Sequence, residues 1–280
     1  MQDLTLKQAL EQGVKRLAVS SSTAELDAQL LLLDTLDKPL SYLFTWPDRV
    51  LCKLQRERYY LLLARREKGE PIAFILGYQD FWTLRLQVSD VTLIPRSDTE
   101  LLVEQALQLF GEKPIKVADL GCGSGAIGLA LASERLQWQI VGTDYIAAAV
   151  SLAQSNQRAL AIQNISFLSG SWFEPLRGRF DLIVSNPPYI AENDAHLAVA
   201  DLRFEPLTAL VSLGNGLQDI AHIIECAPRY LNSQGWLLLE HGYDQAAAVQ
   251  LLLQERKFKH VQTIQDLNKN DRVTFAQWSA

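Results

Sequence analysis

The chain is poor in cysteine, in long apolar runs and in positive charge. Its 280 residues include only three cysteines, Cys52, Cys122 and Cys226, and no two of them form a CxxC pair. This pattern excludes a disulfide framework and predicts a reducing compartment without a metal site. No apolar run approaches the roughly 18 residues of a membrane span. The first residues lack a basic segment followed by an apolar one, so we expect no signal peptide and a cytoplasmic location.

The formal net charge is −6. An acidic protein has no general attraction for nucleic acid, so direct binding of DNA or RNA would need a local basic patch. The rest of the composition is typical of a globular protein, with 48% hydrophobic and 21% charged residues. A chain of this length can bury a large core, and we expect one large domain and one small one.

Glycine is absent between Gly13 and Gly69, and residues 1–78 are predicted to form a small helical bundle. Ser22 and Glu25 have the spacing of a capping box at the start of one helix. The apolar positions behind this box recur at helical intervals and are Leu26, Leu30 and Leu33.

Residues 79–96 have a different pattern. Aromatic and β-branched side chains alternate along Phe81–Val88, and a second apolar run covers Val91–Ile94 after a short Ser-Asp turn. The pattern predicts a β-hairpin that links two domains.

Strand and helix patterns alternate over residues 97–280. Apolar runs predict strands at Ile115–Leu120, Gln139–Asp144, Ile165–Leu168, Leu182–Ser185 and Trp236–Glu240, with helices between them. This alternation is typical of βαβ units that build a parallel sheet with helices on both faces. Val261–Gln265 and Arg272–Trp278 are predicted to form a closing hairpin at the edge of the sheet.

A glycine-rich loop follows the first of these strands. Gly121, Gly123 and Gly125 alternate with Cys122 and Ser124, which lets the backbone turn sharply and approach a ligand closely. In open α/β sheets, ligands bind beyond the carboxyl ends of the strands. The loop also satisfies the G-x-G-x-x-A pattern of dinucleotide-binding proteins, so it does not by itself distinguish NAD from other nucleoside cofactors.

Asp144 ends the second predicted strand. A carboxylate at this position can accept hydrogen bonds from both ribose hydroxyls of a nucleoside cofactor. An aspartate at a strand end can also cap the next helix. The glycine loop on the preceding strand favours the cofactor role.

Asn186-Pro187-Pro188-Tyr189 follows the fourth predicted strand and is expected to face the same crevice. Two prolines are a common stiff exit from a sheet, but this does not account for the flanking Asn and Tyr. An amide or aromatic amine nitrogen is a poor nucleophile because its lone pair is delocalised. The Asn186 side-chain oxygen and the Pro187 carbonyl can each accept an N–H and aim the lone pair at a methyl group. Tyr189 offers a flat face for stacking on a planar group.

This tetrapeptide resembles the motif of methyltransferases that act on planar amino groups: adenine N6, cytosine N4 and glutamine N5. Together with the glycine loop and Asp144, it implies S-adenosylmethionine in place of NAD. Further segments are similar to the PrmC/HemK release factor glutamine methyltransferases, and they cover residues 69–77, 93–100, 203–210 and 238–242. The resemblance extends over nearly the whole chain.

The resemblance implies a Rossmann-like, seven-stranded, S-adenosylmethionine-dependent methyltransferase domain over residues 97–280, and a helical substrate-binding domain over 1–78. It also implies methylation of the glutamine in the Gly-Gly-Gln loop of peptide chain release factors. We further expect a monomer that contacts neither nucleic acid nor membrane. Trp172 would stack beside the adenine of the cofactor. Ser171 stands where the family often has an acid, and a serine would accept a weaker hydrogen bond from the adenine amino group.

Two other functions fit parts of the pattern. An adenine-N6 methyltransferase of DNA or RNA would need base flipping and an electropositive groove, which the acidic composition disfavours. An inactive cofactor-binding scaffold is disfavoured by the intact Asn186 and Tyr189. Three further residues have open roles: Arg96 as an ion-pair partner, Glu205 as a helix cap, and His241 as a structural residue at a strand end.

Overall fold

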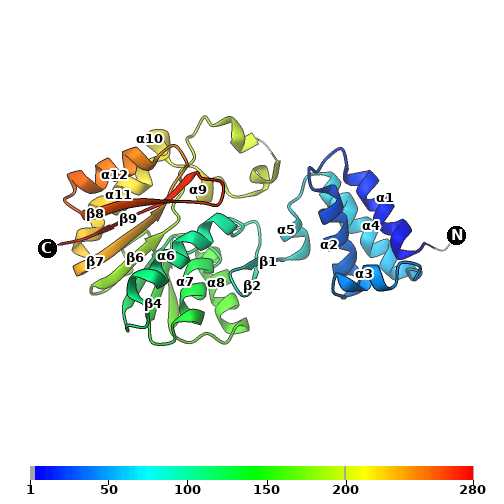
Figure 1. Ribbon diagram of the computed structural model, residues 1–280, viewed down its shortest axis with the longest axis horizontal. Helices are drawn as coiled ribbons and strands as arrows, with labels where there is room; N and C mark the ends of the chain where they lie inside the picture. The colour runs from blue at the N-terminus through cyan, green and yellow to red at the C-terminus, as the bar shows by residue number, and fades with distance from the viewer. Residues whose placement is uncertain (1–3, 199, 280) are drawn as a thin grey trace. The chain divides into compact units, whose positions relative to one another are not determined.

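A computed structural model describes residues 4–198 and 200–279 of the chain. The chain divides into two compact units, Met1–Gly77 with Ala198–Phe204, and Tyr78–Leu197 with Glu205–Ala280. The first unit is helical, and the second contains every strand of the described residues (Figure 1). None of the helices within 4–198 and 200–279 has the length and apolar character that crossing a membrane requires.

The helical unit packs its long helices around a leucine-rich core. Its helices are α1 (Leu6–Leu17), α2 (Ala24–Leu36), α3 (Ser41–Thr45), α4 (Lys53–Glu67) and α5 (Ile72–Leu76). The start of α1 has a capping box, in which the Thr5 hydroxyl accepts the Gln8 N–H at 3.2 Å and the Gln8 side chain accepts the Thr5 N–H at 3.1 Å. Leu31 of α2 and Leu63 of α4 are fully buried between the helices.

The capping box predicted at Ser22 and Glu25 is wrong. α2 begins at Ala24, and Thr23, the residue before it, makes no capping hydrogen bond from its side chain. The Thr23 hydroxyl donates instead to the carboxylate of Asp27, at 3.1 Å. The Thr23 hydroxyl therefore stabilises the buried carboxylate of Asp27 and does not cap the helix.

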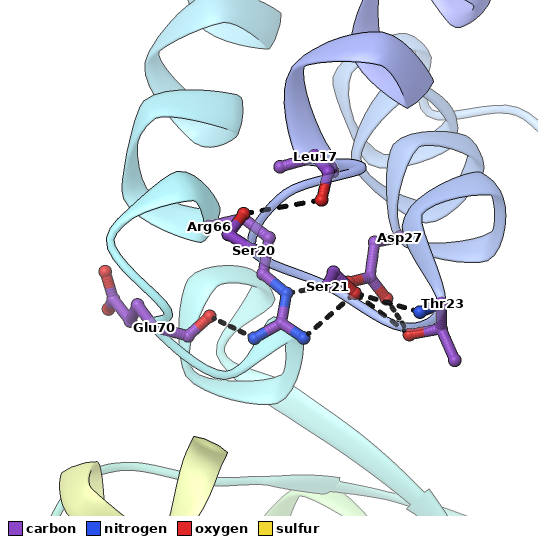
Figure 2. Close-up of polar contacts among 7 residues, drawn as sticks. All are labelled: Leu17, Ser20, Ser21, Thr23, Asp27, Arg66 and Glu70. Carbon is purple, nitrogen blue, oxygen red and sulfur yellow. Dashed lines mark hydrogen bonds and ion pairs between the residues drawn. The ribbon is translucent and has the colours of Figure 1, made fainter. Parts of the chain in front are cut away.

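That buried charge is half of an ion pair between α2 and α4. Arg66 Nε lies 2.7 Å from Asp27 Oδ2, and the two side chains are 9% and 6% exposed. Ser21 donates its hydroxyl to the same carboxylate oxygen at 2.7 Å, and Arg66 donates to the carbonyl of Glu70 at 3.1 Å. Figure 2 shows how these groups converge on the guanidinium. Because each charge is surrounded by hydrogen-bond partners, the pair can be buried without an uncompensated group.

A hairpin forms in this region, but not between the predicted strands. β1 (Tyr78–Phe81) pairs with β2 (Leu84–Gln87) in antiparallel fashion, with Phe81 opposite Leu84. The expected second strand over 91–94 does not form. The chain turns earlier because Trp82 adopts a left-handed φ of 57°, and its N–H is held by the Glu100 carboxylate at 2.8 Å.

The larger unit is built on a seven-stranded sheet with the order β5-β4-β3-β6-β7-β9-β8. The strands are β3 (Lys116–Leu120), β4 (Gln139–Asp144), β5 (Ile165–Ser169), β6 (Phe180–Ser185), β7 (Leu231–Glu240), β8 (Lys259–Gln265) and β9 (Asp271–Gln277). β3 to β7 run parallel, and β9 is antiparallel to both of its neighbours. The predicted α/β fold class with a mainly parallel seven-stranded sheet is confirmed.

Helices cover both faces of this sheet (Figure 1). α6 (Glu100–Phe110), α7 (Ala126–Glu134) and α8 (Ala147–Ala159) pack on one face, where Val117 and Leu182 are buried. α11 (Gln218–Cys226) and α12 (Ala246–Glu255) pack on the other, against Ala118 and Ile183. The alternation of neighbouring residues between the two faces follows from the two-residue period of a strand. The shorter helices are η1 (Ser97–Thr99), η2 (Ala195–Ala198), η3 (Ala200–Phe204), α9 (Leu207–Leu210), α10 (Leu213–Gly216) and η4 (Ala227–Arg229).

The order of the strands places a crevice between the ends of β3 and β6. The chain adds β4 and β5 on one side of β3 and then crosses over to add β6 on the other side. Such a reversal opens a space at the carboxyl ends of the two strands. Leu120 and Ser185 lie opposite each other, and the Ser185 hydroxyl donates to the Leu120 carbonyl at 2.7 Å. The segments that follow, starting at Gly121 and Asn186, therefore leave neighbouring strands at the same level.

Candidate active site

A cavity of about 420 Å³ lies at this end of the sheet. Its volume falls within the roughly 300–1,000 Å³ of small-molecule sites. Its lining includes residues from the ends of β3, β4 and β6, from the segments after β2 and β5, and from α9. The predicted site residues that line it are Gly121, Cys122, Gly123, Ser124, Asp144, Trp172, Asn186 and Pro188. Gly125, Pro187 and Tyr189 are not among its lining residues.

The glycine loop adopts a backbone that only glycine takes readily. Gly121, Gly123 and Gly125 have φ values of 70°, 52° and 85°. A Cβ on Gly121 would lie 3.2 Å from the ring of Trp172, so the missing side chain lets this ring approach the loop. A Cβ on Gly125 would lie 2.9 Å from the ring of Phe167, which belongs to the core. Gly125 therefore shapes the start of α7 without reaching the cavity.

Asp144 joins the loop to the start of α8. Its Oδ2 accepts the Gly123 N–H at 3.0 Å, and its Oδ1 accepts the Ile146 N–H at 2.9 Å. Burial raises the pKa of the Asp144 carboxyl, and these two hydrogen bonds oppose that rise. Ile146 precedes the first turn of α8, so Asp144 holds the approach to this helix and does not cap it. Each carboxylate oxygen has a second lone pair, so the group can also accept from a ligand in the cavity.

The other side of the cavity is made of small and flat side chains. Trp172 has a φ of 46°, and its carbonyl accepts the Thr143 hydroxyl at 2.8 Å. Ser171 lines the cavity next to it. Cys122 is buried, and burial raises the pKa of its thiol well above the ordinary range, so it is an unreactive space-filling residue.

The Asn-Pro-Pro-Tyr segment places its two polar side chains in different environments. Asn186 lines the cavity, and its Nδ2 donates to the Thr99 hydroxyl at 3.1 Å. Pro188 lines the cavity as well, whereas Pro187 is buried. The Tyr189 hydroxyl donates to Glu240 Oε1 at 3.4 Å, and burial raises its pKa, so the phenol stays neutral. The stacking of Tyr189 on a planar substrate group remains a prediction.

Comparison with known proteins shows which family has this sequence and fold. Residues 97–211 match the model of the methyltransferase small domain, and residues 8–77 match that of the PrmC N-terminal domain. The release factor glutamine methyltransferase of Vibrio cholerae is 50% identical over 278 residues, which are 98% of this chain and 97% of that protein. The one from Pseudomonas aeruginosa is 50% identical over 92% of this chain and 94% of its own length. The chain belongs to the release factor glutamine methyltransferase family.

The solved structures agree on the fold of this family member. A methyltransferase from Pyrococcus furiosus aligns with a TM-score of 0.55 at 15% identity, over 78% of this chain and 98% of that chain. At this identity the likeness concerns the fold alone.

Arg96, Glu205 and His241, whose roles the sequence left open, all make contacts that support the structure of the protein. Glu205 is buried, pairs with Arg96, and accepts the Ile94 N–H at 3.1 Å, so it holds the segment that forms one wall of the cavity. His241 is fully buried, with Nε2 2.7 Å from the Thr274 hydroxyl, and burial lowers its pKa. Within residues 4–198 and 200–279, no group of three or more His, Cys, Asp or Glu side chains is placed to hold a metal ion.

Sequence reasoning missed three polar residues that hold the site. Asn156 of α8 is buried and donates to the carbonyl of Ser124 at 2.9 Å, which fixes the glycine loop from behind. Thr99 receives the amide of Asn186, and Glu240 receives the hydroxyl of Tyr189. A usable signal existed for Glu240, because a carboxylate that ends a run of leucines on a buried strand needs an explanation.

Proposed function

We propose that this chain transfers a methyl group from S-adenosylmethionine to the side-chain amide nitrogen, N5, of the glutamine in the Gly-Gly-Gln loop of peptide chain release factors. One observation carries the proposal: Asn186 stands beside the glycine loop in one cavity, with its amide nitrogen already held by Thr99. Family membership over nearly the full chain supports the same substrate.

The cavity fits S-adenosylmethionine. The Asp144 carboxylate can accept the ribose hydroxyls, and Trp172 offers a flat wall for the adenine, with Gly121, Gly123 and Ser124 lining the side along the loop. When bound, the cofactor supplies a methyl group on a cationic sulfur. Ser171 is the polar side chain next to Trp172, and it is neutral where an acid would carry a charge.

The residues of the Asn-Pro-Pro-Tyr segment act on the glutamine. The Asn186 side-chain oxygen accepts one N–H of the target amide, and the Pro187 carbonyl accepts the other. These two hydrogen bonds hold the nitrogen with its lone pair aimed at the methyl carbon. The entropic cost of orienting the nitrogen is therefore met on binding, before the methyl group is transferred. As the new N–C bond forms, the bond between the methyl carbon and the sulfur would break and leave a neutral thioether, and the nitrogen would then lose a proton to water. No side chain with a shifted pKa is needed for that step.

The remaining parts of the proposal concern partners and place. Residues 1–78 hold the protein substrate, 79–96 link the domains, and 97–280 carry out catalysis. The enzyme works as a monomer in the cytoplasm and contacts the release factor without binding nucleic acid or membrane. The net charge of −6 and the three free cysteines support this setting.

Incubation with radiolabelled S-adenosylmethionine tests the proposal. Three substrates are offered separately: an intact release factor, the same factor with the Gly-Gly-Gln glutamine changed to alanine, and duplex DNA. We expect label in the intact factor alone. Label in DNA, or equal label in the glutamine-free factor, would assign the site to another acceptor.

A further inference from the structure

The function proposed for Asn186 depends on which way its amide is turned. A side-chain amide carries an acceptor oxygen and a donor nitrogen, and rotation by half a turn exchanges them. Only the orientation with oxygen toward the substrate can accept an N–H from the target amide. With nitrogen toward the substrate, two donors would face each other. Something in the protein must therefore select one of the two orientations.

The selecting contact is with Thr99 of η1. Asn186 Nδ2 donates to Thr99 Oγ1 at 3.1 Å. Thr99 is 4% exposed and lines the same cavity, so water does not compete freely for its hydroxyl. This contact alone does not fix the amide, because a hydroxyl can accept from the nitrogen or donate to the oxygen.

Glu240, at the end of β7, removes this ambiguity. It is 1% exposed, and its Oε2 has no partner within strict hydrogen-bond geometry among the described residues, which leaves a buried acceptor open. Burial raises the pKa of the Glu240 carboxyl, and a hydrogen bond from the neighbouring Thr99 hydroxyl opposes that rise. An ionised carboxylate is an acceptor only. The Thr99 hydrogen is therefore drawn toward Glu240, and the Thr99 lone pairs are left for Asn186.

Glu240 also serves the other end of the tetrapeptide. Its Oε1 accepts the Tyr189 hydroxyl at 3.4 Å. Arg272 of β9 attracts the charge on Glu240, and Arg272 is itself held by Asp98 at 3.3 Å and by Asp266 at 3.2 Å. One carboxylate, kept in place by these neighbours, thus contacts Tyr189 directly and reaches Asn186 only through Thr99.

We propose that Thr99 and Glu240 are positioning residues for methyl transfer. Glu240 accepts a hydrogen bond from the Thr99 hydroxyl, and Thr99 accepts one from the amide N–H of Asn186. The Asn186 oxygen is left facing the substrate nitrogen. The relay acts through Asn186, which is the residue proposed to contact the glutamine. It rests on the proposed function, because it concerns the orientation of the amide that receives the glutamine.

The test compares Thr99→Val with Thr99→Ser in the full chain. Valine has nearly the shape of threonine but no hydroxyl, and serine keeps the hydroxyl. We expect Thr99→Val to lower the single-turnover rate of methyl transfer by roughly 10- to 100-fold, the scale of a misoriented reacting group. The Kd of S-adenosylmethionine and the KM of the release factor should stay unchanged. Thr99→Ser should recover most of the rate.

Glu240→Gln completes the test, because a neutral amide can donate to Thr99 as well as accept from it. We expect a slower turnover with unchanged Kd, and the double variant Thr99→Val with Glu240→Gln should be no slower than the worse single variant, since both break one relay. A wild-type rate for Thr99→Val, additive losses in the double variant, or loss of cofactor binding in both single variants would overturn the relay. Wild-type protein that fails to label the release factor would instead overturn the proposed function.

Discussion

Single residues in this site each use one hydrogen-bonding function within the protein and keep another for a ligand. Asp144 accepts from two backbone N–H groups and retains lone pairs toward the cavity. Asn186 donates its N–H to Thr99 and retains its oxygen. The contacts within the protein fix the direction of these remaining groups before any ligand arrives, so their loss should affect specific steps.

Loss of the Asn186 side chain should affect the chemical step. We expect Asn186→Ala to fold, to bind S-adenosylmethionine nearly normally, and to lose at least about 100-fold in turnover, as for other preorganised polar contacts. Asn186→Asp should also be slow, because a negative charge beside the sulfonium stabilises the ground state more than the transition state. Tyr189→Phe should be milder. Single-turnover transfer to a release factor measures this order, and a near-normal rate for Asn186→Ala would move the chemistry elsewhere.

Loss of the Asp144 carboxylate should affect cofactor binding. A charge-assisted hydrogen bond contributes roughly 1.5–3 kcal/mol. We therefore expect Asp144→Ala to raise the Kd of S-adenosylmethionine about 10- to 100-fold. Ser171→Ala is the control from the same cavity, and it should change the Kd less because serine carries no charge. Calorimetry measures both, and an unchanged Kd for Asp144→Ala would remove this residue from the site.

The charge on Glu240 should appear in the pH profile. Burial raises the pKa of this carboxyl to about 7, while Thr99, Tyr189 and Arg272 favour the ionised form and Asp98 opposes it. The relay needs the ionised form, so the single-turnover rate should fall as the pH drops below about 7 and level off above it. Glu240→Gln should lose this limb of the profile. An identical acid limb in wild type and Glu240→Gln would assign the titration to another group.

At the scale of elements, the buried pair between α2 and α4 should govern the stability of the helical unit. Removing one partner of a buried ion pair leaves an uncompensated charge, which costs roughly 3–5 kcal/mol. We expect Asp27→Ala to lower the free energy of unfolding by about this amount. Arg58→Ala is the control, because Arg58 pairs with Asp34 at 2.7 Å but is 57% exposed, and such pairs contribute about 1 kcal/mol or less. Urea denaturation compares the two, and equal effects would refute a special role for the buried pair.

The elements differ in how far the sequence predicts them. The strands of the large sheet were predictable because buried parallel strands appear as continuous apolar runs. The inward face of α2 was not predictable from the sequence, because leucines occupy all four positions 30–33 and so mark no single face. Leu31 and Leu32 are fully buried, whereas Leu26, which was expected to face inward, is 53% exposed. The turn of the hairpin depends on a left-handed Trp82, a residue type that gives no signal for that conformation.

The candidate site shows the same division. Motifs along the chain predicted the glycine loop, Asp144 and Asn186, because each follows a strand whose end is recognisable. The contact of Asn186 with Thr99 joins residues 87 positions apart. Only the order of the strands brings such residues together, and no local spacing specifies that order.

At the scale of the whole molecule, the two units differ in their share of the cavity. Every residue that lines the cavity belongs to the unit built on the sheet. The helical unit takes no part in that lining. Among its solvent-exposed apolar side chains are Phe44 of α3 at 73% exposure and Leu54 of α4 at 76%, and the other unit also exposes such side chains. Phe44 and Leu54 are therefore suitable positions at which to test the substrate-binding role proposed for this unit.

This division predicts that substitutions in the helical unit change substrate affinity and not chemistry. Apolar anchors in protein interfaces commonly contribute more than about 1 kcal/mol each, so Phe44→Ala with Leu54→Ala should raise the KM for an intact release factor roughly tenfold or more. The Kd of S-adenosylmethionine and kcat should stay unchanged. Leu267→Ala is the matched control, because Leu267 is an apolar side chain of the other unit at 100% exposure. A short peptide that carries only Gly-Gly-Gln lacks the rest of the factor, so its kinetics should be the same with all variants. If the double variant keeps the wild-type KM for the intact factor, these two side chains take no part in holding the substrate.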